Sequence, residues 1–172
     1  MSMSVSVSAR PDASPAGLAP ALFKKAFRGY PAGVVVVTAD AGSGPVGFTA
    51  TSLTSLSLEP PLVSFGIATG SSSWPHIRRA ETAVVNFLGA EQEDVARRFA
   101  TSGIDRFAAP TAWHRLPQGE PVLDGTAGLL HLAIERFVPA GDHRIVVARV
   151  LGAELDEGRR PLVFHDGAYH AI

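Results

Sequence analysis

The chain has 172 residues, of which 46% are hydrophobic and 18% are charged, and its formal net charge is −1. This composition is typical of one globular domain, and the near-neutral charge argues against nucleic acid or acidic lipid as a partner. Because the chain has no cysteine, it excludes disulfides, thiolate nucleophiles, Cys-ligated zinc and iron–sulfur clusters, so any redox chemistry must come from a bound cofactor.

The first seventeen residues are rich in Ser, Ala and Pro and show neither the basic start nor the apolar run of a signal peptide. We expect residues 1–17 to form a flexible arm in front of a single domain over residues 18–172. No stretch approaches the ~20 apolar residues of a membrane span. A soluble, cytoplasmic protein is therefore expected.

The first half of the domain predicts a helix followed by strands. Apolar residues at helical spacing favour a short amphipathic helix from Leu18 to Arg28. The β-branched run Val34–Thr38 then predicts a buried strand, and residues 40–45 predict a turn. Gly42–Gly47 matches G-x-G-x-x-G, but a strand follows it where a dinucleotide-binding fold requires a helix, so we interpret it as a hairpin turn.

The strand after this turn is unusually rich in hydroxyl groups. Six of the nine residues in Thr49–Ser57 are Ser or Thr, and a hydroxyl taken out of water must find a hydrogen-bond partner. An exposed strand that meets water is the alternative, but Leu53, Leu56 and Leu58 break strict alternation. We therefore favour a cleft for a polar, phosphate-bearing ligand.

Three serines precede a second predicted helix. Strands are expected at 61–68 and 82–88, and between them Ser73 is expected to cap a helix over Trp74–Ala80. The run 71–73 offers hydroxyls and amides where an anion is favoured, with arginines at 78 and 79 nearby. An ordinary cap on a surface helix is the alternative interpretation.

The second half predicts one more helix and several hairpins. Charges at both ends of Glu91–Ala100 complement a helix dipole. Strands are expected over Leu129–Phe137 and His143–Leu155, joined by Pro139–Asp142, and Phe164–Ala171 is expected to form a terminal hairpin. Sequential hairpins with two or three helices favour a small antiparallel barrel.

The histidines do not suggest a metal site. None has the spacing of a metal-ligand set, and His165 and His170 lie five residues apart across a predicted turn. His143 differs because it follows Gly141 and Asp142 at the start of a strand, although a lone histidine there is also compatible with a surface or capping role. No G-x-S-x-G occurs, so serine-hydrolase chemistry is disfavoured.

Taken in order, several runs resemble the flavin reductase-like family with the FMN-binding split barrel. They cover about Leu18 to Ile172 and are Tyr30–Thr38, Gly47–Ser52, Leu58–Val63, Ser73–Trp74, Ala83–Leu88, Arg97–Ala100 and Gly141–Ile145. The resemblance implies a mainly β, antiparallel split barrel that forms a homodimer. It also implies NAD(P)H-dependent reduction of FMN or FAD, often for a separate monooxygenase that uses the diffusing reduced flavin.

The resemblance also assigns roles to individual positions. Those implied to contact the flavin are Pro31, Gly33, Thr49, Ala50, Thr51, Ser52, Leu53, Ser55, Phe65, Gly66, Ile67, Ser71, Ser72, Trp74 and Arg98. Among them Ser71 and Ser72 are implied to approach the phosphate. Gly141, Asp142 and His143 are implied to face the nicotinamide, with His143 as the catalytic residue that orients it. Ala32 stands where relatives often carry a hydroxyl, and residues 107–119 match no motif.

Two other functions remain open at this point. One is a non-catalytic flavin-binding module, which has no need of the turn at His143. The other is a tight-FMN oxidase of the pyridoxamine-phosphate oxidase type, which is expected to have more cationic phosphate ligands. The residues do not distinguish FMN from FAD or NADH from NADPH.

Overall fold

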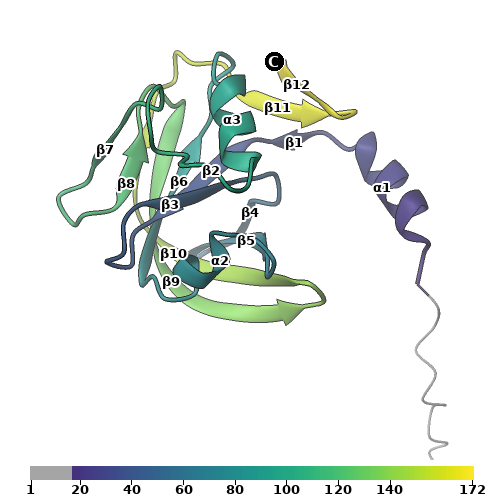
Figure 1. Cartoon of the computed structure of the whole chain (residues 1–172), viewed down its shortest axis with the longest axis horizontal. Helices are drawn as coiled ribbons and strands as arrows, with labels where there is room; N and C mark the ends of the chain where they lie inside the picture. Colours follow the sequence, from purple (N-terminus) through teal and green to yellow (C-terminus); the bar gives the residue numbers. More distant parts are fainter. Residues whose placement is uncertain (1–16) are drawn as a thin grey trace, which may run out of the picture.

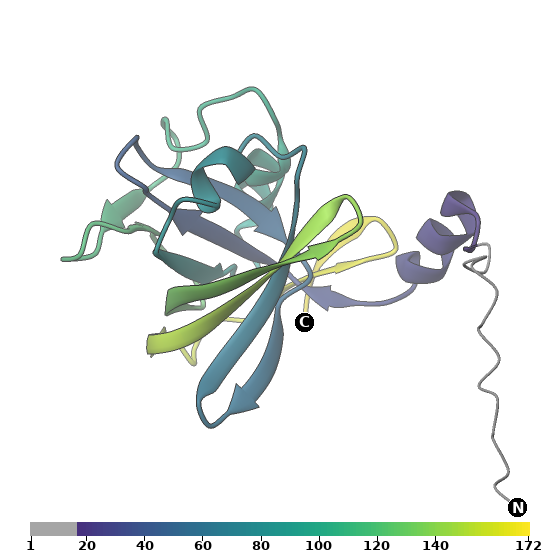
Figure 2. The same cartoon turned by 90° about the horizontal axis from the view of Figure 1, so that it is seen from below.

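The computed structural model describes residues 17–172, so the predicted arm lies outside the described residues apart from Gly17. Antiparallel strands dominate these residues, with three short helices beside them (Figures 1 and 2). The elements are α1 (Pro20–Arg28), β1 (Ala32–Gly33), β2 (Val35–Ala39), β3 (Val46–Ala50), β4 (Thr54–Leu58), β5 (Pro61–Ala68), α2 (Trp74–Ile77), β6 (Thr82–Phe87), α3 (Glu93–Ala100), β7 (Trp113–Arg115), β8 (Pro121–Leu123), β9 (Gly128–Ala140), β10 (His143–Leu155), β11 (Leu162–His165) and β12 (Ala168–Ala171). The predicted mainly β fold is confirmed.

One large sheet curls around the main core. Its seven strands follow the order β3-β2-β6-β9-β10-β5-β4, while β1, β11 and β12 form a smaller sheet and β7 pairs with β8. Phe48 of β3 and Phe65 of β5 lie near opposite ends of the large sheet, yet their ring centroids are 6.3 Å apart in a common core. The sheet is therefore rolled into a barrel-like shape with β3 and β4 at its two ends.

The run of valines in β2 is buried on both faces of the sheet. Val35 and Val37 belong to the core inside the rolled sheet, whereas Val36, together with Val34 just before β2, packs in a second cluster with Phe99 of α3. A strand covered on both sides needs no alternation of apolar and polar residues. Because β2 is covered on both faces, its β-branched run alone was sufficient to predict a buried strand.

The expectation of one continuous strand through Thr49–Ser57 is wrong. β3 ends at Ala50 and β4 begins at Thr54, and residues 51–53 have no strand conformation. The break is required by topology, because the chain leaves one end of the large sheet and crosses to the other end. Of the hydroxyl residues in this segment, Thr51 and Ser52 therefore lie on a crossover connection, whereas the others lie on β3 and β4.

The helix after the three serines is also shorter than expected. α2 ends at Ile77, and the Ser73 side chain makes no capping hydrogen bond. Its hydroxyl, in a residue that is only 1% exposed, instead donates to the carbonyl of Gly47 at 2.9 Å. Instead of capping α2, the Ser73 side chain thus links residues 71–73, called the serine loop below, to β3.

The remaining predicted elements are confirmed with small changes of boundary. The hairpin of Gly42–Gly47 joins β2 and β3, and β11 and β12 form the terminal hairpin. β9 runs on to Ala140, so its connection to β10 shrinks to Gly141 and Asp142. Among residues 17–172, no helix is long and apolar enough to cross a membrane.

Candidate functional site

A cleft of about 560 Å³ opens where β3 ends, beside the end of β5. Eight residues implied by the family resemblance line it: Thr49, Ala50, Thr51, Ser52, Gly66, Ile67, Ser71 and His143. The structure thus gathers positions that span 95 residues of sequence into one concave surface. A cleft with apolar walls and a few converging polar groups is the usual form of a small-molecule site.

Two hydroxyls, one in β3 and one on the crossover, already hold the wall of this cleft in place. Thr49 donates from Oγ1 to the carbonyl of Ala96 at 2.6 Å and so fixes α3 against β3. Ser52 Oγ accepts the N–H of Gly66 at 2.8 Å and fixes the crossover to β5. These residues therefore build the cleft as well as line it.

Gly66 lies between Ser52 and His143 on the floor of the cleft. A Cβ atom at this position would lie 3.4 Å from Ser52 Oγ and 3.9 Å from His143 Cδ2. With no side chain at Gly66, the floor between these two residues is backbone alone. A flat ring can approach such a surface closely.

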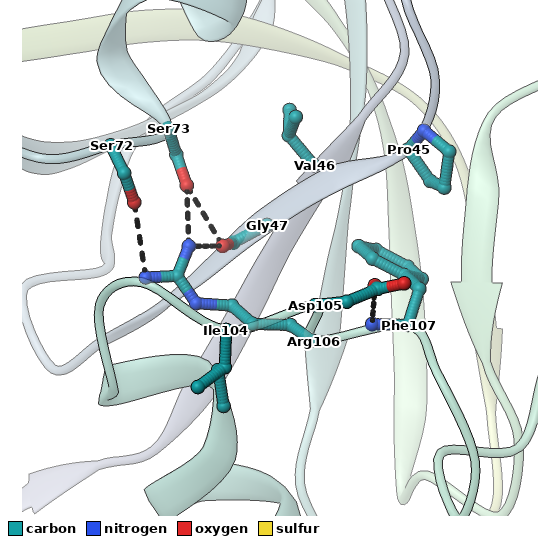
Figure 3. Close-up of a pocket in the computed structure, with 9 residues that line it drawn as sticks. All are labelled: Pro45, Val46, Gly47, Ser72, Ser73, Ile104, Asp105, Arg106 and Phe107. Carbon is teal, nitrogen blue, oxygen red and sulfur yellow. Dashed lines mark hydrogen bonds between the residues drawn. The ribbon is translucent and has the colours of Figure 1, made fainter.

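One end of the cleft contains a half-buried arginine, Arg106. Figure 3 shows its guanidinium reaching from its own loop to Ser72, Ser73 and the carbonyl of Gly47. The nitrogen–oxygen distances are 3.3 Å to Ser72 Oγ, 3.0 Å to Ser73 Oγ and 2.9 Å to the Gly47 carbonyl. Burial lowers the pKa of Arg106, but an arginine stays charged in proteins.

The charge of Arg106 is not neutralised by an acidic side chain within residues 17–172. No ion pair of the described part of the chain includes it. A half-buried cation without a counter-ion is costly unless an anion binds beside it. The Arg106 end of the cleft is therefore suited to bind an anionic group.

The serine loop contributes less than the sequence suggested. α2 has only four residues, and Pro75 in its first turn has no N–H to offer. Arg78 and Arg79 are exposed and do not line the cleft. The positive charge at this end comes from Arg106 instead of from a helix N-terminus.

The other end of the cleft carries the turn of β9 and β10. Gly141 has a φ of 59°, and the carbonyl of Asp142 accepts from both the N–H and the hydroxyl of Thr69, at 2.9 and 3.0 Å. His143 Nδ1 lies 2.7 Å from Asp142 Oδ1, and this hydrogen bond lowers the pKa of Asp142. Because an ionised carboxylate only accepts, the proton sits on Nδ1 and the ring orientation is fixed.

A second hollow of about 920 Å³ adjoins the cleft, and both share Thr51 and Ser52. Pro31, Gly33 and Leu53, which the resemblance places near the flavin ring, line this hollow together with aromatic residues of α1. These three positions are thus adjacent to the cleft, although they do not line it.

Several other implied positions lie outside the cleft. Ser55 is exposed on β4, Phe65 points into the core at 1% exposure, and Trp74 packs edge-on against Phe137 at 5.4 Å. Arg98 contacts the loop that carries Arg106, with Nη1 3.5 Å from the carbonyl of Asp105. Gly141 and Asp142 adjoin the cleft through His143 alone.

The sequence patterns did not indicate Arg106, Phe99 or Ser102, which also line the cleft. Arg106 lies one residue before the stretch that matched no motif. Its partners Gly47 and Ser73 are 59 and 33 residues away, so no local pattern marks it. Within residues 17–172 no group of three or more His, Asp or Glu side chains is placed to hold a metal ion.

Comparison with known proteins agrees with this geometry. Residues 27–172 match the flavin reductase like domain. The chain belongs to the flavin reductase-like family. The resemblance seen in the sequence is thereby confirmed.

Individual members of this family match over most of their length. An NADH:FMN oxidoreductase of Rhodococcus erythropolis is 47% identical over 95% of this chain and 87% of its own length. HsaB of Rhodococcus jostii, the reductase subunit of a flavin-dependent monooxygenase, is 35% identical over 89% and 78%. A crystal structure of a flavin reductase domain protein from an Arthrobacter species matches with a TM-score of 0.82 at 36% identity, covering 88% of this chain and 94% of that one.

Proposed function

We propose that this protein is an NAD(P)H:flavin oxidoreductase that supplies reduced flavin to a partner monooxygenase. Family membership supports the activity, and the cleft supports the ligand. The observation that carries the proposal is the pairing of a half-buried, uncompensated Arg106 at one end with the oriented His143 at the other. A phosphate-bearing ring ligand would place its phosphate at the Arg106 end, and a hydride donor would be oriented at the His143 end.

The residues present fit a flavin. Arg106 and Ser71, which line the cleft, would hold the phosphate, since a guanidinium and a hydroxyl are strong donors to anionic oxygens, while Ser72 lines the smaller hollow and supports the guanidinium. The ribityl chain would follow Thr51 and Ser52, and the ring would lie over the bare backbone at Gly66. When bound, the flavin supplies the ring that accepts the hydride.

The chain's own residues contribute by positioning and by excluding water. Hydride transfer requires the nicotinamide to lie parallel to the flavin ring at close range, so orientation is the main catalytic task. His143 is fixed by Asp142 and lines the cleft next to Gly66. We assign it to orienting the dihydronicotinamide, with no acid or base role.

We also propose that the protein is a homodimer. α1 has no buried residue, and its apolar side chains Leu22, Phe23 and Phe27 are 53%, 54% and 58% exposed. Figures 1 and 2 both show α1 projecting from the body of the domain. A nine-residue helix is not stable alone in water, so this face requires cover, and a second copy would provide it beside the hollow that adjoins the cleft.

Steady-state oxidation of NADH and NADPH, with and without added FMN or FAD, tests the proposal. We expect oxidation only in the presence of flavin, because the chain has no cysteine and no other redox group. A non-catalytic carrier would bind flavin without oxidising either nucleotide. Oxidation that continues undiminished after complete removal of flavin would contradict the proposal.

A further inference from the structure

Arg106 separates the cleft from a smaller hollow. Arg106 lines both the 560 Å³ cleft and a smaller hollow of about 230 Å³. In Figure 3 it spans the space between its own loop and the serines that precede α2. Arg106 therefore blocks a ligand in the cleft, with its anionic end at this side chain, from extending into the smaller hollow.

The barrier is firmly held. Arg106 Nε donates to the carbonyl of Thr101 at 2.9 Å, in addition to the bonds with Gly47, Ser73 and Ser72. A guanidinium has five N–H donors, so one on Nη2 has no partner among residues 17–172. Since four bonds from a charged donor must break to move it, the side chain is more suited to capping an anion than to swinging aside.

The far side of the barrier is acidic. Asp105 lines the smaller hollow, and its Oδ1 accepts the N–H groups of Phe107 and Ala108 at 3.0 and 3.2 Å. These bonds fix the carboxylate on the wall of the smaller hollow, where it forms no ion pair with Arg106. A second phosphate that continued past Arg106 in this direction would meet a like charge, which disfavours it.

FMN and FAD differ at this point of the molecule. FMN ends at its phosphate monoester, whereas FAD continues through a second phosphate to adenosine. We propose that Arg106 and Asp105 together select FMN over FAD as the flavin substrate, a proposal that rests on the flavin reductase activity proposed above. Arg106 caps the single phosphate, and Asp105 repels the second.

Equilibrium binding and turnover with riboflavin, FMN and FAD test this selection. Riboflavin lacks phosphate and so reports contacts to the ring and ribityl chain alone. For the wild-type protein we expect FMN to bind most tightly and FAD about tenfold more weakly, with kcat/KM in the same order. Equal affinities for FMN and FAD, as expected if the adenosine projects into solvent, would overturn the proposal.

Asp105→Asn sharpens the test, because the amide oxygen can still accept from Phe107 and Ala108 while the charge is lost. We expect FAD binding to improve about two- to fivefold, the range of a single exposed charge contact, and FMN and riboflavin binding to stay within about twofold. Asp94→Asn is the matched control: Asp94 is exposed on α3 and lines none of the three pockets.

The outcomes separate this inference from the function on which it rests. If Asp105→Asn changes FMN and FAD binding by the same factor, or if Asp94→Asn has the same effect, the selection by Asp105 is wrong and the reductase activity stands. If no flavin supports oxidation of NADH or NADPH, the proposed function itself fails.

Discussion

The two ends of the cleft are built in different ways. The Arg106 end is half-buried and tied by hydrogen bonds to β3, to the serine loop and to the end of α3. The His143 end is a two-residue turn with an exposed carboxylate and a half-exposed imidazole. The first arrangement suits a flavin that must stay bound while the hydride is transferred, and the second suits a nicotinamide that enters and leaves. Variants at the two ends should therefore separate flavin affinity from hydride transfer.

The largest effect is expected at the open end. His143→Ala should slow reduction of pre-bound flavin by about 100-fold, since misplacing a reacting ring by about 1 Å costs that much, and should leave flavin affinity nearly unchanged. Stopped-flow reduction over a range of NADH and NADPH concentrations measures both steps. A collapse of flavin affinity with normal reduction of the flavin that remains bound would assign the turn to the flavin site instead.

The buried end should show the opposite pattern. Arg106→Ala should weaken FMN binding about 10- to 100-fold, the cost of losing hydrogen bonds from a charged donor, while riboflavin affinity stays the same. Quenching of flavin fluorescence gives both dissociation constants. Arg79→Ala, at an exposed arginine outside the three pockets, serves as control, and an equal loss of riboflavin binding in Arg106→Ala would indicate general collapse of the cleft.

A smaller difference is expected between two serines of the hydroxyl-rich segment, Ser52 on the crossover and Ser55 on β4. Ser52→Ala should weaken flavin binding about two- to tenfold, because it removes a hydroxyl from the cleft wall and frees the Gly66 amide. Ser55→Ala should have no effect, because Ser55 is exposed on β4. Flavin titration of the two folded variants decides this, and equal losses would mean that the cleft extends along β4.

The smallest effect concerns the orientation of His143. The pKa of Asp142 is lowered by its hydrogen bond from His143, so the pair contributes stability above the ordinary aspartate pKa of about 3.9, and this is lost as pH falls through the lower folded value. We expect Asp142→Asn to lower the melting temperature slightly at pH 7, and the difference to vanish in strong acid. A difference that grows as the pH falls would contradict the assignment.

Local patterns in the sequence were sufficient to predict most of the strands and helices of the fold. The valine run of β2 and the hairpin turns depend on neighbouring residues, so they were visible without the structure. The crossover at 51–53 could not be predicted from the sequence, because the same hydroxyl-rich composition fits a strand or a connection. The choice between them depends on which end of the sheet the chain joins next.

The candidate site was predicted only in part, because some of its contacts join residues that are distant in sequence. Ser52 and His143 lie in runs that resemble the family, Ser71 lies just before another such run, and the structure brings all three to one cleft. Arg106 was missed because its partners are distant in sequence. The Phe65 side chain points into the core while Gly66 beside it lines the cleft, a difference that depends on which face of β5 turns inward.

Anaerobic mixing of the purified protein with FMN and a nicotinamide nucleotide tests the central claim most directly. The absorbance bands of oxidised flavin and of NADH or NADPH are followed together. We predict that both bands decline in equal molar amounts, and only when protein, nucleotide and flavin are all present. Stable binding of flavin with no loss of either band, for NADH and NADPH alike, would contradict the account and leave a flavin-binding module in its place.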